Sequence, residues 1–458
     1  MTKRAWPAWA DPRDILDLLR LSVPIAVSRS SFMLMFLTDT IVLGRNAPEQ
    51  LPYVLNSHFP VGVLLGLSLG LLLGVSILTA EMAGRGEQEN TGRVFRRGLL
   101  TASVLGMVCV IPMYFGAFAL FASLGFEGAI LQGTAGVTRI LSLAILFQLF
   151  NNVITYYLEA LRKPLLVAVA MYIGVVVNLF LDLAFVSGEW GFPQLGANGV
   201  AMATTGTNFV LMITLFVFVA IFTPGFKRSD ASDDDEGKRQ IRVGVGMAVS
   251  NIAEFGAFNF THIIATWVGL AAASVYGMTF QTIGFVFMAF LGLGTATSVR
   301  VAERLGRGET QAVRNASRLG LLTCVLVGIL TAILIVTFPE AIAAVFVQDD
   351  AVVAGVQLRP LLTQVVIYAA AVVLFDGIQN VAAMASRARG LVWQPALVHV
   401  GSYLGLMLPL AYVFSIHFER GVFGMLEGVI IASVVAGVSQ VLILEFVAPA
   451  ETKKRAET

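Results

Sequence analysis

Long apolar runs with almost no charged residues are the feature that most restricts how this chain can fold. A run of about 20 apolar residues is long enough to cross a bilayer as a helix. Only 13% of the 458 residues are charged, about half the share of a soluble domain. The runs predict an all-α polytopic membrane protein with twelve transmembrane helices, at about 16–44, 53–79, 97–124, 134–158, 164–187, 196–223, 243–270, 274–299, 318–346, 355–385, 393–416 and 421–447.

Basic residues gather in every second connection between these runs, for example at 85–97, 227–242 and 300–318. Loops rich in Lys and Arg stay on the cytoplasmic side of a membrane. We therefore expect a multi-pass protein of the cell inner membrane with both termini cytoplasmic. Residues 11–20 carry Asp and Arg on one face and Ile and Leu on the other. This pattern predicts an interfacial lead-in to the first span.

One phrase occurs twice, as AEMAGRGE at 80–87 and as AERLGRGE at 302–309. The offset of 222 residues also relates AVS at 26–28 to AVS at 248–250, and ten of nineteen positions from 69 to 87 are identical to their counterparts. The chain is therefore predicted to be two halves of six spans each. Because six is an even number, both halves enter the membrane in the same direction, which predicts a pseudo-two-fold axis along the membrane normal.

The repeat also predicts the domain organisation. We expect an N-lobe at 1–225, a polar cytoplasmic linker at 226–241 and a C-lobe at 242–458. The repeated phrase lies where a span leaves the membrane, and its glycines predict a helix stop followed by a tight turn.

Sequence motifs for a motor or an enzyme are absent. The chain has no GxxxxGK[ST], HExxH or GxSxG pattern and no cluster of His and Cys, so ATP hydrolysis and the commonest catalytic centres are not predicted. A two-lobed membrane protein of this kind is most simply a secondary transporter. We expect no cofactor beyond a coupling ion, H⁺ or Na⁺, no nucleic-acid partner, and a monomer in the lipid bilayer.

Two carboxylates occur at similar depth in the predicted N-lobe. Asp39 and Asp182 each lie five residues before the outer end of a span, and Asn178 lies one turn before Asp182. A charge inside the bilayer costs several kcal/mol and marks a functional candidate. Two adjacent carboxylates favour holding a proton between them. These residues predict a proton or cation site, whereas the alternative is that Asp39 caps a helix end facing water.

Two further carboxylates occur deep in the predicted C-lobe. Glu254 lies twelve residues after Arg242, and Asp376 lies eleven residues before Arg387, which places them roughly 18 and 16 Å from the cytoplasmic side. Asn251 lies one turn before Glu254. The matched depth predicts a second site for an ion or a cargo charge, with Na⁺ as one possible ion at Glu254 and Asp376. The alternative is two unrelated polar residues facing a wet cavity.

Three other polar residues inside the spans have less definite interpretations. Arg29 lies in the middle of the first span. It is interpreted either as a counter-charge for a carboxylate or as a side chain that snorkels or lines the cavity. His262 and His399 are interpreted as polar residues satisfied within a helical bundle.

Five segments, taken together, resemble the multidrug and toxic compound extrusion (MATE) family. The resemblance follows the order of the chain over nearly its whole length, and twelve spans in two six-helix lobes is the architecture of that family. The segments are SVPIAVSRSSFMLMFLTDTIVLG (22–44), LEALRKPLLVAVAMYIGVVVNLFLD (158–182), LGANGVAMATTGTN (195–208), NIAEFGAFNF (251–260) and FDGIQNVAAMASRARG (375–390).

The resemblance implies site residues and an activity. Asp39, Asn178, Asp182 and Thr204 match the N-lobe proton site of DinF-like and archaeal members, while Glu254 and Asp376 match the C-lobe cation site of NorM-like members. Acids in both lobes leave the coupling ion open between H⁺ and Na⁺. Arg29 is not part of the pattern. The implied function is an antiporter that exports organic cations and other amphipathic compounds by alternating access.

Three other classes of membrane protein are alternatives to an antiporter. A flippase for lipid-linked oligosaccharides or another amphiphile has a related two-lobe plan, but its cavity would be basic, and the charges inside these spans are mainly acidic. An ion channel is disfavoured because channels are mostly symmetric oligomers. An intramembrane enzyme is disfavoured because no catalytic pair is found.

Overall fold

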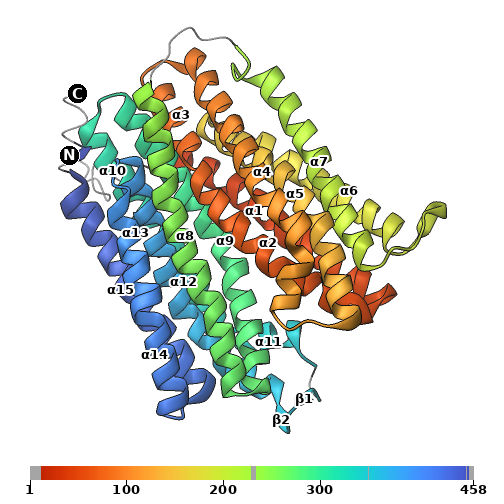
Figure 1. Cartoon of the computed structure of the whole chain (residues 1–458). Coiled ribbons are helices and arrows are strands. Elements are labelled where there is room, and N and C mark those ends of the chain that lie inside the picture. The colour runs from red at the N-terminus through yellow and green to blue at the C-terminus, as the bar shows by residue number, and fades with distance from the viewer. Residues whose placement is uncertain (1–11, 228–233, 349, 450, 453–458) are drawn as a thin grey trace. The chain divides into compact units, whose positions relative to one another are not determined.

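The computed structural model of the protein describes residues 12–227, 234–348, 350–449 and 451–452 (Figure 1). Within them the regular structure is helical except for one short hairpin, in which β1 (Val352–Val353) pairs antiparallel with β2 (Val356–Gln357). Both ends of the chain are basic, at Lys3 and Arg4 and at 453–455, in line with the cytoplasmic termini expected from the sequence. These residues lie outside the described ones, as do 228–233 of the predicted linker.

The contacts within the chain divide it into two compact units. The middle unit is Val27–Ala248, and the split unit combines the described residues of Met1–Ala26 and Val249–Thr458. The helices α1 (Pro12–Asn46) and α8 (Asp234–Val268) each belong partly to both units. Both change unit inside the tripeptide AVS, at positions that the 222-residue repeat makes equivalent. The predicted lobe boundaries stay a prediction.

The middle unit is built around α5. This helix packs against α2, α4 and α7, and α6 packs against α7. The elements between the two shared helices are η1 (Pro48–Gln50), α2 (Leu51–Leu72), α3 (Gly74–Gly84), η2 (Gln88–Asn90), α4 (Gly92–Ser123), α5 (Gly128–Ala160), α6 (Pro164–Phe185), η3 (Glu189–Gly191) and α7 (Ala197–Phe222).

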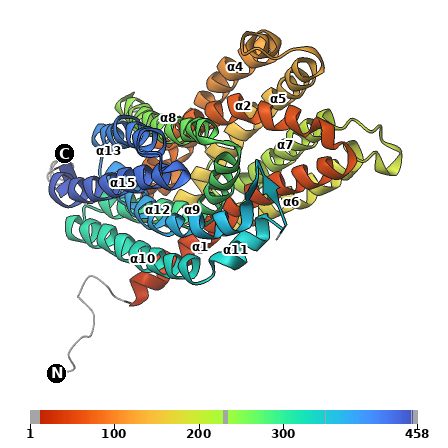
Figure 2. The same ribbon diagram turned by 90° about the horizontal axis from the view of Figure 1, so that it is seen from below.

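The split unit is built around α12 in the same manner. This helix packs against α9, α10 and α15, which surround it in Figure 2. The helical elements after α8 are α9 (Leu270–Gly306), α10 (Thr310–Thr337), α11 (Pro339–Phe346), α12 (Leu358–Ala388), α13 (Trp393–His399), the π-helical η4 (Val400–Met407), α14 (Leu408–Tyr412), the π-helical η5 (Val413–His417), α15 (Gly421–Leu442) and the π-helical η6 (Ile443–Val447).

The two central helices are buried on all sides near their C-terminal ends. Every residue from 151 to 160 of α5 is buried, and so is every residue from 379 to 388 of α12. A helix segment buried on every face lies inside a bundle rather than at its surface. Polar residues in these two segments are therefore enclosed by protein.

Other helices keep one apolar face exposed. On α4 the exposed side chains recur every three or four residues, at Leu100, Val104, Met107, Val108, Ile111, Phe115 and Phe118. This spacing makes one continuous stripe along a helix. So large an apolar surface indicates contact with a membrane.

Eleven helices of the described residues are long and apolar enough to cross a membrane. The remaining predicted span, at 243–270, corresponds to α8, which is less apolar because it contains Asn251, Glu254, Asn259 and His262. The predicted run at 53–79 is broken at Leu73 into α2 and α3, and the run at 318–346 is broken at Phe338 into α10 and α11. The prediction of an all-α polytopic membrane protein is confirmed.

The repeated phrase forms the same helix stop in both halves. Gly86 and Gly308 have φ values of 81° and 74°, which glycine adopts without steric cost. The next amide donates to the carbonyl five residues earlier in the chain, from Glu87 to Met82 and from Glu309 to Arg304, at 3.0 and 3.1 Å. This is the hydrogen-bond pattern of a Schellman cap, as predicted.

Ion pairs fix the N-terminal turns of α1 and α8. Asp14 accepts hydrogen bonds from Arg300 at 2.6 Å and from Arg304 at 2.7 Å. The predicted interfacial lead-in is thus the first part of α1, and it is bound to α9. In the middle unit, the buried carboxylate of Glu81 pairs with Arg85 and Arg239. Residues 234–241 of the predicted linker form the first two turns of α8.

Candidate proton and cation sites

The four N-lobe residues singled out from the sequence lie together in the middle unit. Asp39 on α1 accepts a hydrogen bond from the Asn178 amide at 2.9 Å and another from the Thr204 hydroxyl at 3.3 Å. Asp182 on α6 lies within hydrogen-bond reach of Asp39. Asp39, Asn178 and Asp182 are all buried. Three helices therefore bring two carboxyl groups and two neutral donors into one site.

The Asp182 carboxyl group is fully enclosed but lacks donors. Its side chain has no exposed surface, and neither of its oxygens receives a hydrogen bond from a described group. An ionised carboxylate buried without donors costs several kcal/mol. The Asp39 donors compensate that carboxylate, so the neighbouring Asp182 is the group that requires a proton.

In the split unit, the side-chain amide of Gln379 on α12 links Glu254 on α8 to His399 on α13. The Gln379 amide nitrogen donates to a Glu254 oxygen at 3.1 Å, and the Gln379 oxygen lies 2.7 Å from Nε2 of His399. The His399 ring nitrogen Nε2 also lies 3.7 Å from the second Glu254 oxygen. Glu254, Gln379 and His399 thus form one continuous chain of polar groups.

Asp376 lies in the same unit with a different partner. The Tyr403 hydroxyl donates to an Asp376 oxygen at 3.0 Å. Asp376 is close enough to Glu254 for electrostatic repulsion, but each has its own hydrogen-bond donor. Asn251 is buried one turn before Glu254. The predicted C-lobe acids therefore lie in one region without forming a carboxyl–carboxyl pair.

Arg29 has a partner that the sequence did not reveal. Its guanidinium donates to both carboxylate oxygens of Glu159 at 3.1 Å and lies 5.9 Å from the centre of the Tyr156 ring. Glu159 is fully buried at the end of α5. Arg29 is indeed a counter-charge, but for a residue that falls just beyond the predicted span at 134–158.

The sequence predicts that Arg387 lies in a cytoplasmic connection after the span at 355–385. In the structure α12 continues to Ala388, and the Arg387 side chain is buried and donates to the Ser250 hydroxyl at 2.8 Å. Arg387 thus adds a positive charge close to Glu254.

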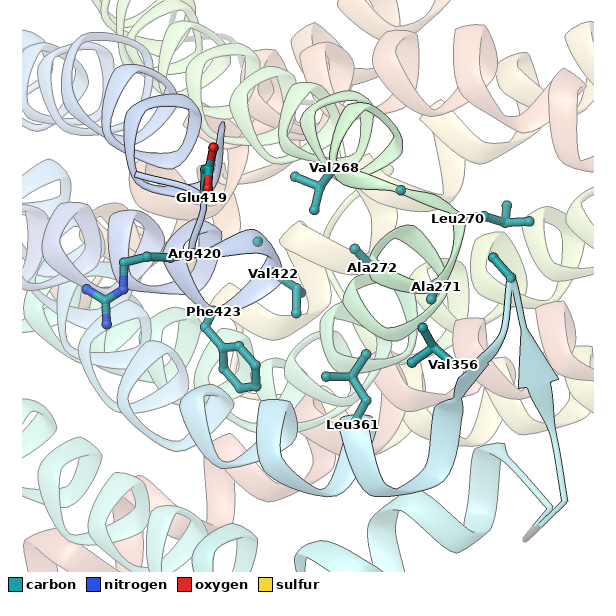
Figure 3. Close-up of a pocket in the computed structure, with 13 residues that line it drawn as sticks. Val268, Leu270, Ala271, Ala272, Val356, Leu361, Glu419, Arg420, Val422 and Phe423 are labelled. Atoms are coloured by element: carbon teal, nitrogen blue, oxygen red, sulfur yellow. The ribbon is translucent and has the colours of Figure 1, made fainter. Parts of the chain in front are cut away.

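Two other features consist mainly of aromatic and apolar groups. His262 packs between the rings of Tyr276 and Phe280 at centroid distances of 4.9 and 5.0 Å. A pocket of about 400 Å³ in the split unit is lined mainly by apolar side chains, among them Leu361 and Phe423 (Figure 3). Neither Glu254 nor Asp376 lines it.

Comparison with known sequences detects two successive copies of one family pattern, as the internal repeat predicts. The model of the MatE family matches residues 24–184 and again residues 247–413. A "Probable multidrug resistance protein NorM" of Caulobacter vibrioides is 32% identical over 435 residues, which cover 92% of this chain and 89% of the relative. "Multidrug resistance protein MdtK" of Pectobacterium atrosepticum is 24% identical, with 79% of each chain covered.

Solved structures share the fold. A crystal structure of "MATE in the bent conformation" has a TM-score of 0.86 at 21% identity and covers 98% of each chain. An outward-facing multidrug resistance MATE family transporter has a TM-score of 0.86 at 22% identity, with 96% of each chain covered. Because the family model matches most of the sequence in two successive copies, the chain belongs to the MatE family of multidrug and toxic compound extrusion transporters.

Proposed function

We propose that this protein is a proton-coupled antiporter that exports cationic and amphipathic drugs across the cell inner membrane, with both termini in the cytoplasm. The names of the Caulobacter and Pectobacterium relatives support a drug as cargo. The proposed coupling site is Asp39 and Asp182, with Asn178 and Thr204 as supporting donors. The protein carries out transport and no covalent chemistry.

The observation that carries the proposal is the pairing of Asp39 with a donor-free Asp182. Two unit charges about 4 Å apart repel by roughly 4 kcal/mol at an effective dielectric constant near 20. One shared proton removes this repulsion and lets one carboxyl group donate to the other. Loss of that proton leaves a site with two negative charges, which attracts either a cationic cargo or the next proton.

This competition supplies a coupling mechanism. A carrier exchanges two ligands when each binds the same groups and excludes the other. A proton entering from outside neutralises the pair and weakens its attraction for the cation. The departing cargo and the entering proton therefore alternate at Asp39 and Asp182.

The first test uses purified protein in liposomes with ethidium as the cargo. A pH gradient and a Na⁺ gradient are imposed separately, and dye movement is followed by fluorescence. The proposal expects dye movement with the pH gradient alone. Movement with Na⁺ alone would contradict proton coupling and assign the coupling ion to Glu254 and Asp376.

The same assay tests the residues. Asp182→Asn and Asp39→Asn keep the size of the side chain but cannot exchange a proton, so each is expected to reduce pH-driven transport at least 10-fold. Asp235→Asn is the matched control, because the Asp235 side chain is 92% exposed. Full transport by either buried variant at normal protein levels would exclude that residue from coupling.

A transporter of another amphiphile is the remaining alternative. If neither gradient moves any dye while the protein remains monodisperse, drug export is contradicted. A flippase for lipid-linked oligosaccharides then becomes the better hypothesis, and transfer of a labelled lipid between leaflets is its direct test.

A further inference from the structure

Three arginine side chains surround one carboxylate of the split unit, near the start of α10. Arg318 on α10 donates to Glu445 on η6 through Nη2 at 2.7 Å and through Nε at 3.0 Å, and Arg314 donates to the same carboxylate at 3.3 Å. Arg389, directly after α12, lies close enough to Glu445 for electrostatic attraction. In the described part of the chain, Glu445 is the only acid that forms an ion pair with any of them. Three positive charges, here called the arginine cluster, therefore face one negative charge.

The hydrogen bonds of the arginine cluster leave donors unused. Arg389 is 2% exposed, and among the described groups its guanidinium donates only to neutral acceptors, at Leu444, Val313 and Ser317. Nε of Arg389 and Nε of Arg314 are both buried without an acceptor in the described residues. A buried charge requires a counter-charge and hydrogen-bond partners. The cluster therefore suits a further anion with several acceptor oxygens, and phosphate matches the planar guanidinium in this way.

Exposed apolar side chains lie next to the arginine cluster on two helices. On α10, Ile329 is exposed and lies eleven residues after Arg318, which is three turns along the same helix face. On the other side, Leu442 and Phe446 lie close to Glu445 along the chain and are also exposed. Apolar surface of this extent indicates contact with the acyl chains of a membrane. An anion held by the cluster thus lies where that surface ends, at the level of the lipid headgroups.

We propose that the arginine cluster binds the phosphate group of an anionic phospholipid. The chemistry that it recognises is phosphate, and the neighbouring apolar surface favours a lipid over free phosphate as the source. Basic sites between transmembrane helices bind anionic headgroups in this manner. A zwitterionic phospholipid is disfavoured, because its own cationic group restores the excess of positive charge. The bound lipid joins α10, η6 and the end of α12, and it uses none of the residues of the proposed ion sites.

The experiment is native mass spectrometry of the purified protein in an uncharged detergent, with phosphatidylglycerol as the probe. Phosphatidylcholine and inorganic phosphate are added in separate samples. Phosphatidylglycerol is expected to bind roughly 5-fold more tightly than phosphatidylcholine, the effect of about one charge near a basic site. Equal binding of the two lipids overturns the proposal. Inorganic phosphate is expected not to displace phosphatidylglycerol at equal concentration, because it has no acyl chains. Displacement would assign the cluster to free phosphate and overturn a lipid as its ligand.

Arg314→Gln tests the arginine cluster, because it removes one charge and leaves the Arg318–Glu445 pair in place. It is expected to weaken phosphatidylglycerol binding roughly 5-fold and to leave phosphatidylcholine binding unchanged. The control is Arg420→Gln, because the Arg420 side chain is similarly exposed, at 54% against 43% for Arg314, but pairs with its own acid, Glu427. The control is expected to bind both lipids like the unmodified protein. Equal effects of the two variants, or none in Arg314→Gln, overturn the proposal.

Glu445→Gln is expected to act in the opposite direction. The Glu445 carboxylate occupies guanidinium groups that phosphate would bind, so its neutralisation is expected to tighten phosphatidylglycerol binding roughly 5-fold. Damage to the fold cannot produce tighter binding. The fold of each variant is checked on heating by the reaction of the buried Cys109 and Cys324 with a thiol-reactive dye. Unchanged or weaker binding by folded Glu445→Gln overturns the proposal. No cargo or ion gradient is present, so the outcome is independent of whether the chain exports drugs.

Discussion

At the scale of single residues, the two halves carry opposite charges at equivalent places. The sequences LFQLFNNV in α5 and LFDGIQNV in α12 align at an offset of 228 residues, which makes Glu159 the counterpart of Arg387. Glu159 pairs with Arg29, whereas Arg387 donates to Ser250. The middle unit therefore encloses an ion pair where the split unit encloses a cation next to its acids, so the two ion sites have different electrostatic surroundings.

The Arg29–Glu159 pair is expected to behave as one unit. Arg29→Met leaves a buried carboxylate without its partner and is expected to lower the free energy of unfolding by about 3–5 kcal/mol. The double variant Arg29→Met with Glu159→Gln removes both charges and is expected to recover more than half of that loss. Thermal unfolding of the purified proteins measures both effects.

The control for this pair is Lys227→Met, because the Lys227–Glu89 pair is 64% and 72% exposed. Exposed ion pairs contribute at most about 1 kcal/mol, so its effect is expected to be small. Equal losses in Arg29→Met and in the double variant would show that Arg29 acts through packing and not through its charge.

These residues also show what a single sequence can reveal of the site. Asp39, Asn178 and Asp182 were predicted because carboxylates inside apolar runs are conspicuous and an i, i+4 pair shares a helix face. Glu159 was missed because it follows the predicted span by one residue. Gln379 and Tyr403 carry no charge at neutral pH, and their contacts join different helices. Spacing along one helix contains no information about such contacts.

At the scale of elements, glycines allow two pairs of helices to approach closely. A Cβ atom on Gly70 of α2 would lie 2.5 Å from Cα of Ala248, and one on Gly292 of α9 would lie 2.7 Å from the amide nitrogen of Ala26. These two contacts are related by the 222-residue repeat. The first half of α8 is thus packed on α2 in the way that the first half of α1 is packed on α9.

Adding one methyl group at these glycines is expected to separate the helices. Gly70→Ala and Gly292→Ala are each expected to cost about 1–3 kcal/mol, because backbone atoms must move. The controls lie on the same helices: Gly62→Ala and Gly277→Ala meet no heavy atom within 4 Å. There the loss of glycine flexibility is expected to stabilise the helix by about 0.5–1 kcal/mol. Melting temperatures of the four variants decide whether close approach matters.

The sequence predicted the membrane-spanning helices, but it did not predict where these helices are broken or change to π-helical turns. Hydropathy alone identifies the spans, because the bilayer sets their length. It does not identify the break at Leu73, where Gly74 lies directly against the backbone of Gln240. Nor does it show the π-helical turns of η4 and η5. Both features depend on neighbouring helices rather than on local hydrophobicity.

At the scale of the whole molecule, each half gives the start of its first helix to the other unit. Residues 12–26 of α1 belong to the split unit, and residues 234–248 of α8 belong to the middle unit. A fragment that contains only one half can therefore form only an incomplete unit. It lacks the helix segment that the other half contributes to that unit. This explains why the contact boundaries at Ala26 and Ala248 differ from the predicted lobe boundaries, which follow the order of the spans.

Cutting the chain within 228–233 tests this exchange. The two fragments produced together are expected to co-purify and to move ethidium in liposomes, because each supplies the segment the other lacks. Either fragment produced alone is expected to aggregate after extraction. A lone fragment that stays monodisperse and unfolds cooperatively would show that the exchanged segments are dispensable.

The exchange of α1 and α8 segments also has a consequence for ancestry. A chain of half this length could have formed the same contacts only with a second copy, as a domain-swapped homodimer in which each copy completes the other. Fusion of two such copies keeps every contact while freeing each half to change separately. The opposite charges at Glu159 and Arg387 are a divergence that a homodimer, whose copies share one sequence, could not have acquired.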